Sequence, residues 1–143
     1  ARVVNKPIVA VTGSNGKSTV VALLASILRA DGRSFGVGGN LDGENFKPAL
    51  DLLTEEQKEI YVLELSSFQL ETTPELNAQA VALLNLSQDH MDRYSDATEY
   101  LSATQNIFNG AKTVCINLDD LLTLPLDTAV RTVRYKIQQE EST

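Results

Sequence analysis

Short apolar runs alternate with helical patterns along the chain. Aliphatic and β-branched side chains dominate the runs at 8–12, 34–37, 60–65, 80–86 and 113–117, and this pattern predicts a strand for each. A one-sided apolar stripe between Val20 and Leu28 predicts a helix, with Gly32 placed to end it. A second helix is expected from Asp96 to about Asn109. Strands separated by helices predict an α/β fold with a mostly parallel sheet.

Composition limits the classes of function. The chain has 143 residues, 43% of them hydrophobic, which fits one domain spanning 1–143. A formal net charge of −7 argues against general binding to nucleic acid or anionic membranes. Cys115 is the single cysteine and cannot form an internal disulfide, and no apolar run approaches the length of a membrane span. We expect a soluble cytoplasmic protein. After Tyr135 the tail is polar, and the chain stops where a parallel-sheet domain often continues, so we expect a fragment of a longer protein or an excised domain.

The segment TGSNGKST, at 12–19, places a tight turn between a strand and a helix. Gly13 and Gly16 permit backbone torsions that let successive N–H groups converge on phosphate oxygens at the helix N-terminus. Lys17 adds a positive charge for the β- and γ-phosphates, and the Ser18 hydroxyl can reach Mg²⁺. Val11 stands where the longer GxxxxGK(S/T) pattern has its first glycine, so the match is to a shorter form. The candidate nucleotide-binding residues are Gly13, Ser14, Asn15, Gly16, Lys17, Ser18 and Thr19. The alternative is a tight turn with a solvated lysine.

Two further polar segments follow apolar strands. In YVLELSSFQLE, at 61–71, Glu64 lies where a parallel strand ends, and a carboxylate at that edge is a candidate magnesium ligand. Ser66 and Gln69 could line a polar substrate or simply form a turn. In NLSQDHMDRY, at 85–94, the only histidine, His90, lies between two aspartates and is a candidate metal ligand. A solvated or structural histidine is the alternative.

In this order, TGSNGKST, GVGGN, YVLELSSFQLET and NLSQDHMDRY make the chain resemble the central ATP-binding domain of the Mur ligases of peptidoglycan synthesis. The resemblance covers most of residues 7–125 and implies an ATP-dependent, amide-forming ligase. In the reaction it implies, ATP phosphorylates the carboxylate of UDP-MurNAc-L-Ala, and the amine of D-glutamate then attacks the acyl phosphate. It implies a monomer with ATP and Mg²⁺ as cofactors.

The resemblance also implies roles for single residues. Lys17 would hold the phosphates, Ser18 and Glu64 one magnesium ion, and His90 a second. Asn40, Ser66 and Gln69 would lie near the reacting carboxylate of the uridine-nucleotide substrate. Lys17, Glu64 and His90 are therefore the candidate catalytic residues.

The chain departs from the family pattern in three places. Thr104 stands where these ligases usually carry a lysine that is carbamylated to bind the second metal; the helical wheel turns Thr104 inward. The loop after Asn40 is longer than usual, and the family's N- and C-terminal domains have no counterpart. Two other functions stay open: a nucleotide-binding module without turnover, and a P-loop ATPase switch, which should not bind UDP-MurNAc-L-Ala.

Overall fold

The computed structural model describes residues 6–39, 57–86, 97–125 and 130–137. They form a 6-stranded sheet in the order β2-β3-β1-β4-β5-β6, and every strand pair is parallel. The strands are β1 (Ile8–Thr12), β2 (Phe35–Gly39), β3 (Ile60–Glu64), β4 (Ala80–Leu83), β5 (Thr113–Asn117) and β6 (Arg131–Tyr135). The helices are α1 (Lys17–Ala30), α2 (Ser67–Glu71) and α3 (Ala97–Gln105), with 3₁₀ helices η3 (Asn106–Phe108) and η4 (Leu121–Thr123). The predicted α/β class with a parallel sheet is confirmed.

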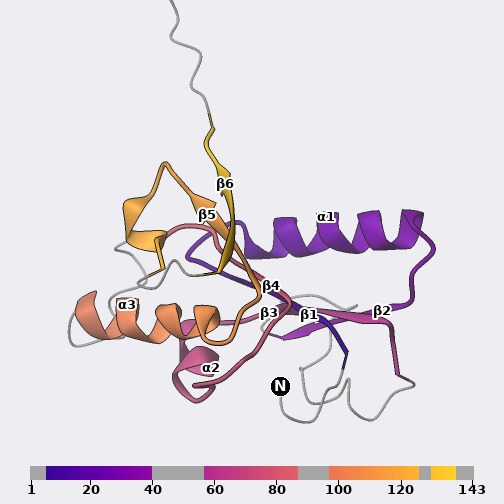
Figure 1. Ribbon diagram of the computed structural model, residues 1–143, viewed down its shortest axis with the longest axis horizontal. Coiled ribbons are helices and arrows are strands. Elements are labelled where there is room, and N and C mark those ends of the chain that lie inside the picture. Colours follow the sequence, from indigo (N-terminus) through magenta and orange to yellow (C-terminus); the bar gives the residue numbers. More distant parts are fainter. Residues whose placement is uncertain (1–5, 40–56, 87–96, 126–129, 138–143) are drawn as a thin grey trace, which may run out of the picture.

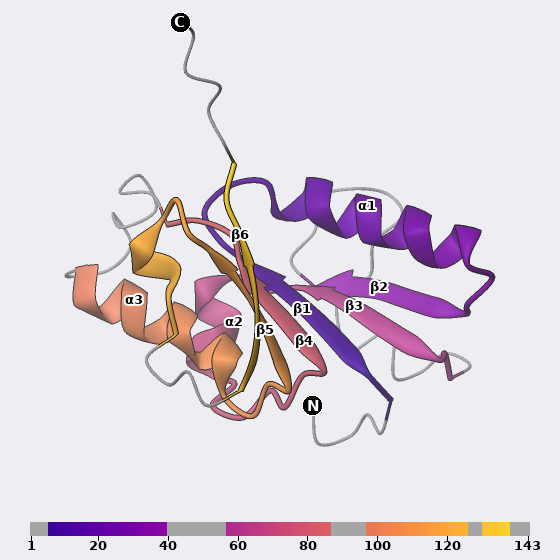
Figure 2. The same ribbon diagram turned by 45° about the horizontal axis from the view of Figure 1, so that its top comes forward.

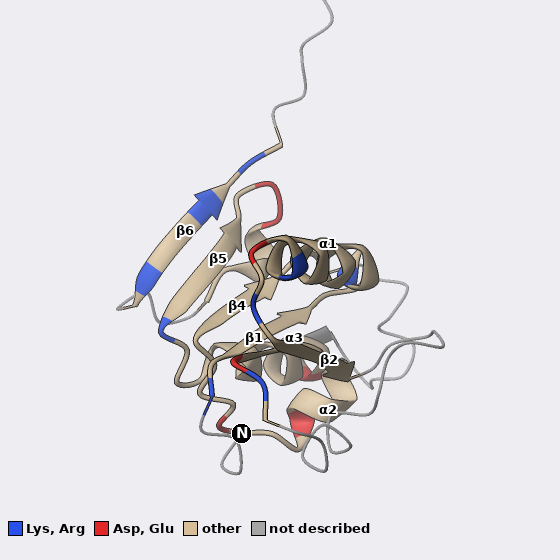
Figure 3. Ribbon diagram, turned by 90° about the vertical axis from the view of Figure 1, so that its right-hand side faces the viewer, with Lys and Arg blue, Asp and Glu red and all other residues tan. Residues whose placement is uncertain are grey.

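Helices cover both faces of the sheet. α1 lies on one face and α2 and α3 on the other, which is clear in the edge-on view (Figure 1, Figure 3). Because neighbouring strand residues point to opposite faces, Val11 and Val62 pack against Val21 of α1, whereas Ala10 and Leu63 belong to the larger core on the other side. The same alternation places Glu64 on the α1 face, together with Val62.

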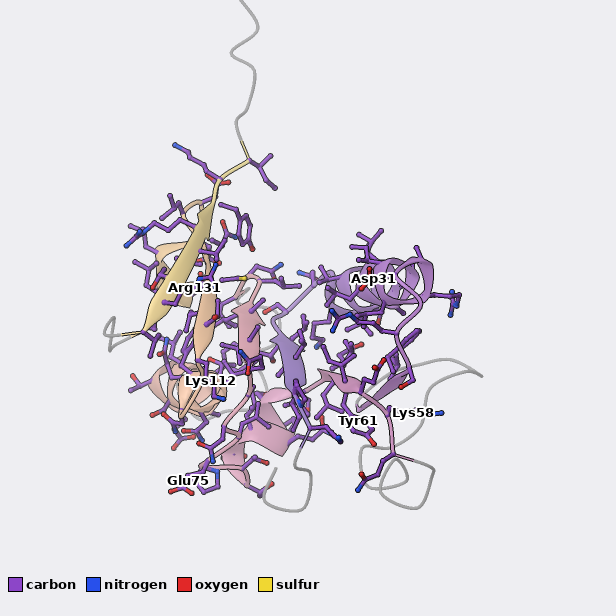
Figure 4. The ribbon with its side chains drawn as sticks, turned by 45° about the vertical axis from the view of Figure 1, so that its right-hand side comes forward. Asp31, Lys58, Tyr61, Glu75, Lys112 and Arg131 are labelled. Atoms are coloured by element: carbon purple, nitrogen blue, oxygen red, sulfur yellow. The ribbon has the colours of Figure 1, made fainter. Side chains whose placement is uncertain are left out.

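The order in which strands are added to the sheet reverses at β1. It leaves β1 through α1 to the edge strand β2 and returns to β3 beside β1, and the next strand, β4, lies on the other side of β1 (Figure 2). The carboxyl ends of β1, β3 and β4 are therefore neighbours. In open parallel sheets, ligands bind at such a reversal of strand order. Glu75 and Lys112 lie at the opposite edge, near the amino ends of β4 and β5 (Figure 4).

Every element that the apolar pattern predicted is present, with bounds within a few residues of the prediction. β1 and β5 agree with the prediction, β2 and β3 differ from it by one or two residues, and β4 ends at Leu83 instead of 86. α1 ends at Ala30 with Asp31 as its C-cap, one residue before the predicted cap Gly32. The φ of 72° at Gly32 lets Arg33 N donate to Leu28 O at 3.1 Å. The second helix stops being α-helical at Gln105 and continues as η3. α2 and β6 were not predicted.

Some expectations lie outside the described residues. These are Asp96 as an N-cap and the loop that follows Asn40. Within the described part of the chain, no helix has the length and apolar character needed to cross a membrane.

Candidate functional site

The loop between β1 and α1 has the geometry of an anion-binding turn. Gly13 has a φ of 146° and Gly16 a φ of 83°, values that side-chain-bearing residues rarely adopt. Gly16 is the N-cap of α1 and provides no side-chain hydrogen bond to the first turn. The first turn of α1 therefore depends on its surroundings for acceptors.

The N–H groups at the start of α1 are not hydrogen-bonded within the described part of the chain. The first helical hydrogen bond is donated by Val20 N to Gly16 O at 3.1 Å. For the N–H groups of Lys17, Ser18 and Thr19, the described residues offer no acceptor. Ser18 and Thr19 are exposed and Lys17 is partly exposed. Three adjacent donors, the positive end of a helix dipole and a lysine together favour a phosphate-sized anion.

Glu64 is beside this helix start. Its side chain lies at the carboxyl end of β3 on the α1 face, and the residue is only 3% exposed. Ser18 Oγ donates to Glu64 Oε2 at 3.1 Å. The fold thus brings together the hydroxyl and the carboxylate that the sequence placed 46 residues apart. An acidic oxygen and a hydroxyl next to an anion site suit Mg²⁺, which is usually held by one or two carboxylates together with phosphate oxygens.

The last residue of the edge strand β2, Gly39, lies in close contact with the backbone of Glu64. A Cβ on Gly39 would lie 1.9 Å from Glu64 O, so only glycine permits this approach. Gly39 is paired with Glu64 in the sheet register. The position of the carboxylate therefore depends on a residue of the GVGGN segment.

The side chains of Asn85 and Tyr100, from other parts of the chain, hydrogen-bond the loop 13–16. The sequence predicted a role in this loop for neither residue. Asn85, directly after β4, hydrogen-bonds the backbone of Ser14 and Asn15. Tyr100 of α3 places its hydroxyl 3.1 Å from Ser14 Oγ, and both residues are buried. A polar residue at the end of the strand next to β1 was the available signal for Asn85. Tyr100 had no sequence signal, because the apolar pattern placed it in the core.

Ser66 and Gln69 form a capping box at the start of α2. Ser66 Oγ accepts from Gln69 N at 3.2 Å, and Gln69 Oε1 accepts from Ser66 N at 2.9 Å. Ser66 and Gln69 therefore have the turn-forming role that the sequence offered as an alternative to substrate binding. Their substrate-binding role remains a prediction.

The remaining predicted site residues are not brought into the described geometry. His90 and Asn40 lie outside the described residues. Thr104 is 1% exposed, as the helical wheel predicted, and its hydroxyl donates to its own helix, 3.0 Å from Leu101 O and 3.2 Å from Tyr100 O. In the described segments, no group of three or more His, Cys, Asp or Glu residues could hold a metal by itself. Among the described residues, a metal at Glu64 would need further oxygens, such as those of a bound phosphate.

Two side chains on β5 and β6, Cys115 and Tyr135, have raised pKa values. Burial raises the pKa of the Cys115 thiol on β5, so the thiol is neutral near pH 7. Burial, followed by the nearby Cys115, Asp119 and Asp120, raises the pKa of Tyr135 on β6. Both residues lie on strands away from β1, and neither contacts the loop 13–16 through a hydrogen bond among the described residues.

Comparison with known proteins gives a consistent result. Residues 11–143 match the family model of the Mur ligase middle domain. A UDP-N-acetylmuramoylalanine–D-glutamate ligase of Marinobacter nauticus is 55% identical over 120 residues, covering 84% of this chain and 26% of that protein. The enzyme of the same name from Alcanivorax borkumensis is 47% identical over 140 residues, covering 98% of this chain and 31% of its own.

The fold comparison agrees. A solved UDP-N-acetylmuramoyl-L-alanyl-D-glutamate–2,6-diaminopimelate ligase superposes with a TM-score of 0.76 at 27% identity, covering 95% of this chain and 33% of the other. The chain thus spans between a quarter and a third of the length of these relatives.

Proposed function

The chain belongs to the Mur ligase family, whose middle domain it matches over residues 11–143, and from this we propose that it binds ATP as its magnesium complex at the carboxyl edge of the sheet. The N–H groups of Lys17, Ser18 and Thr19 would bind phosphate oxygens, and the Lys17 ammonium would neutralise their charge. Ser18 and Glu64 would hold the magnesium ion. When bound, that ion would neutralise the charge that develops on the transferred phosphoryl group.

One observation carries this proposal. The three N–H groups of residues 17–19 have no acceptor in the described part of the chain, and Ser18 Oγ lies 3.1 Å from the buried Glu64 carboxylate. An anion site and a cation site are therefore adjacent on one helix turn. A nucleotide with its magnesium ion is the ligand that places both charges at this separation.

For the complete protein we propose the reaction of the relatives that it matches. The name of these relatives describes joining of D-glutamate to UDP-N-acetylmuramoylalanine. The complete protein would act as a cytoplasmic monomer in peptidoglycan synthesis, through an acyl phosphate on the substrate carboxylate. Ser66, Gln69, Asn40 and His90 would serve the substrate and the second metal, as the resemblance implies. Since the chain spans only part of its relatives, we expect it to bind nucleotide without forming the amide.

Calorimetry tests the nucleotide site. Mg·ADP is titrated into the 143-residue chain, into Lys17→Ala and into Lys112→Ala. Loss of charge-assisted contacts worth about 1.5–3 kcal/mol should weaken binding by Lys17→Ala roughly 10- to 150-fold. Lys112 is an exposed lysine just before β5, at the far edge of the sheet (Figure 4), so its removal is the matched control for net charge. Equal affinity in all three proteins would contradict the proposal.

Thr104 favours a second function, a nucleotide-binding module without turnover. Its hydroxyl is bonded within α3 and cannot supply the carboxylate that the resemblance implies for this position. The test is release of ADP that depends on UDP-MurNAc-L-Ala and D-glutamate. It compares this chain with Thr104→Lys supplied with bicarbonate, each alone and fused to the other domains of a relative. Turnover by the fused unmodified chain would exclude the second function.

A further inference from the structure

The Asn85 side chain, directly after β4, hydrogen-bonds two consecutive residues of the loop 13–16. Asn85 Oδ1 accepts from Ser14 N at 3.0 Å and from Asn15 N at 2.8 Å, and Asn85 Nδ2 donates to Asn15 O at 2.8 Å. Ser14 N also lies 3.0 Å from the backbone oxygen of Asn85. The Asn85 amide thus supplies hydrogen-bond partners to backbone groups of Ser14 and Asn15, which lie outside any helix or strand.

Gly13 lies directly against the same residue. A Cβ on Gly13 would be 3.2 Å from both the N and the O of Asn85. With its φ of 146°, Gly13 lets the loop rest on the end of β4 without a side chain between them. Gly13 therefore packs against the backbone of Asn85, and the next two residues, Ser14 and Asn15, are hydrogen-bonded to Asn85.

This arrangement separates the N–H groups of the loop into two sets. In glycine-rich anion sites, successive N–H groups can all point at the ligand. Here the N–H groups of Ser14 and Asn15 point at Asn85 instead, whereas those of residues 17–19 have no acceptor in the described part of the chain. The donors left for an anion therefore include those of the first helical turn.

We propose that Asn85 is a positioning residue, which keeps the loop 13–16 in its anion-binding conformation before the ligand arrives. Asn85 acts through the loop and does not itself contact phosphate. The effect on nucleotide affinity rests on the proposed function; the effect on the loop does not. Apparent affinity scales with the fraction of molecules in the competent conformation. If loss of the Asn85 amide lowers that fraction to about one tenth, affinity falls about tenfold.

Asn117 provides a matched control. Asn117 is the last residue of β5, and Asn85 follows β4. The Asn117 side chain makes two hydrogen bonds to backbone, against three for Asn85: Asn117 Nδ2 donates to Leu84 O at 2.8 Å, and Asn117 Oδ1 accepts from Asp119 N at 2.9 Å. None of these partners belongs to the loop 13–16. Asn117→Ala should therefore resemble Asn85→Ala in lost stability but not in lost ligand affinity.

The first measurement is calorimetry with Mg·ADP on the unmodified chain, Asn85→Ala, Asn117→Ala and Lys17→Ala. We expect affinity about tenfold weaker for Asn85→Ala and within twofold of the unmodified chain for Asn117→Ala. If Lys17→Ala weakens binding but Asn85→Ala does not, the positioning role is wrong and the proposed nucleotide site stands.

The second measurement is amide hydrogen exchange without nucleotide. Exchange at Asn15 should be at least tenfold faster in Asn85→Ala than in Asn117→Ala, because the Asn85 amide is its acceptor. Ser14 N also donates to the backbone oxygen of Asn85, so its exchange should change less. Asn85→Asp keeps an acceptor for both N–H groups, so it should retain their protection and remain informative if Asn85→Ala does not fold. Faster exchange in Asn85→Ala without any effect of Lys17→Ala on binding would uphold the positioning of the loop and overturn the nucleotide site. Unchanged exchange in Asn85→Ala, or loss of protection in Asn85→Asp, would overturn the positioning role.

Discussion

Gly39→Ala tests how the sheet edge holds Glu64. The added Cβ would lie 1.9 Å from Glu64 O, whereas real Cβ contacts are essentially never under 3.0 Å, so the ends of β2 and β3 must separate by more than an ångström. The displaced atom is backbone, which cannot rotate away as a side chain does. The φ of 112° adds strain for any residue with a Cβ. Gly32→Ala is the control, because Gly32 also has a positive φ, of 72°, but nothing lies within 4 Å of its Cβ position.

The structure gives the size of the difference. Positive-φ strain costs roughly 1–2 kcal/mol in both variants. Gly39→Ala also loses one or two hydrogen bonds at the end of the β2–β3 ladder, at about 1 kcal/mol each, and some packing of Val37 on α1. We expect the free energy of unfolding to fall by about 1 kcal/mol in Gly32→Ala and by about 3–4 kcal/mol in Gly39→Ala.

Urea unfolding at 25 °C measures both values, and calorimetry with Mg·ADP measures the consequence for the site. Because the backbone of Glu64 must move, Gly39→Ala should also weaken magnesium-dependent binding, whereas Gly32→Ala should leave it unchanged. Equal losses of stability in the two variants, within about 0.5 kcal/mol, would refute the reasoning from the close approach.

Two further predictions concern titratable side chains. Glu64→Gln should weaken ADP binding in the presence of magnesium, but not in EDTA, and leave the melting temperature of the nucleotide-free chain nearly unchanged; a large fall in that temperature would indicate a structural carboxylate. The pKa of Cys115 is raised in the folded state, so its contribution to stability is present below the pKa of the unfolded thiol and is lost as pH rises through the folded value. Stability should therefore decline with alkaline pH more steeply in the unmodified chain than in Cys115→Ala, as measured by urea unfolding between about pH 7 and 10.

The sequence indicated the parts of the fold that depend on local pattern. β1 and β5 were predicted to the residue because each is a short run rich in β-branched side chains and bounded by turn residues. β1 is buried at all but one position, whereas buried and half-buried positions alternate along β5. The loop 13–16 was predicted because its glycines and lysine are adjacent in sequence. α2 was missed because it has 5 residues and is stabilised by the capping box at its start. β6 was missed because its residues RTVRY are mostly exposed and polar.

Contacts between distant segments were harder to predict. The sequence predicted that Ser18 and Glu64 lie at the same edge of the sheet. Ser18 comes after one strand and Glu64 ends another, and the carboxyl ends of parallel strands meet at one edge. It did not indicate which amide holds the loop, because Asn85 and Ser14 are 71 residues apart and depend on β4 lying next to β1. Periodicity can assign Asn85 to the end of a strand, but the strand order decides what it contacts.

Thr104 bears on which metal position this chain can form. Its side chain is 1% exposed, and its hydroxyl is already hydrogen-bonded within α3, so it contributes packing and no negative charge. Glu64, by contrast, is a carboxylate within hydrogen-bond distance of the first turn of α1. Magnesium binding needs negative oxygens, and among the described residues at this edge Glu64 offers them to the phosphate loop. The magnesium ion expected at Ser18 and Glu64 should therefore bind with the nucleotide even where a second ion does not. In the chain fused to the other domains of a relative, Thr104→Lys should change the rate of ADP release more than it changes the affinity for Mg·ADP measured by calorimetry.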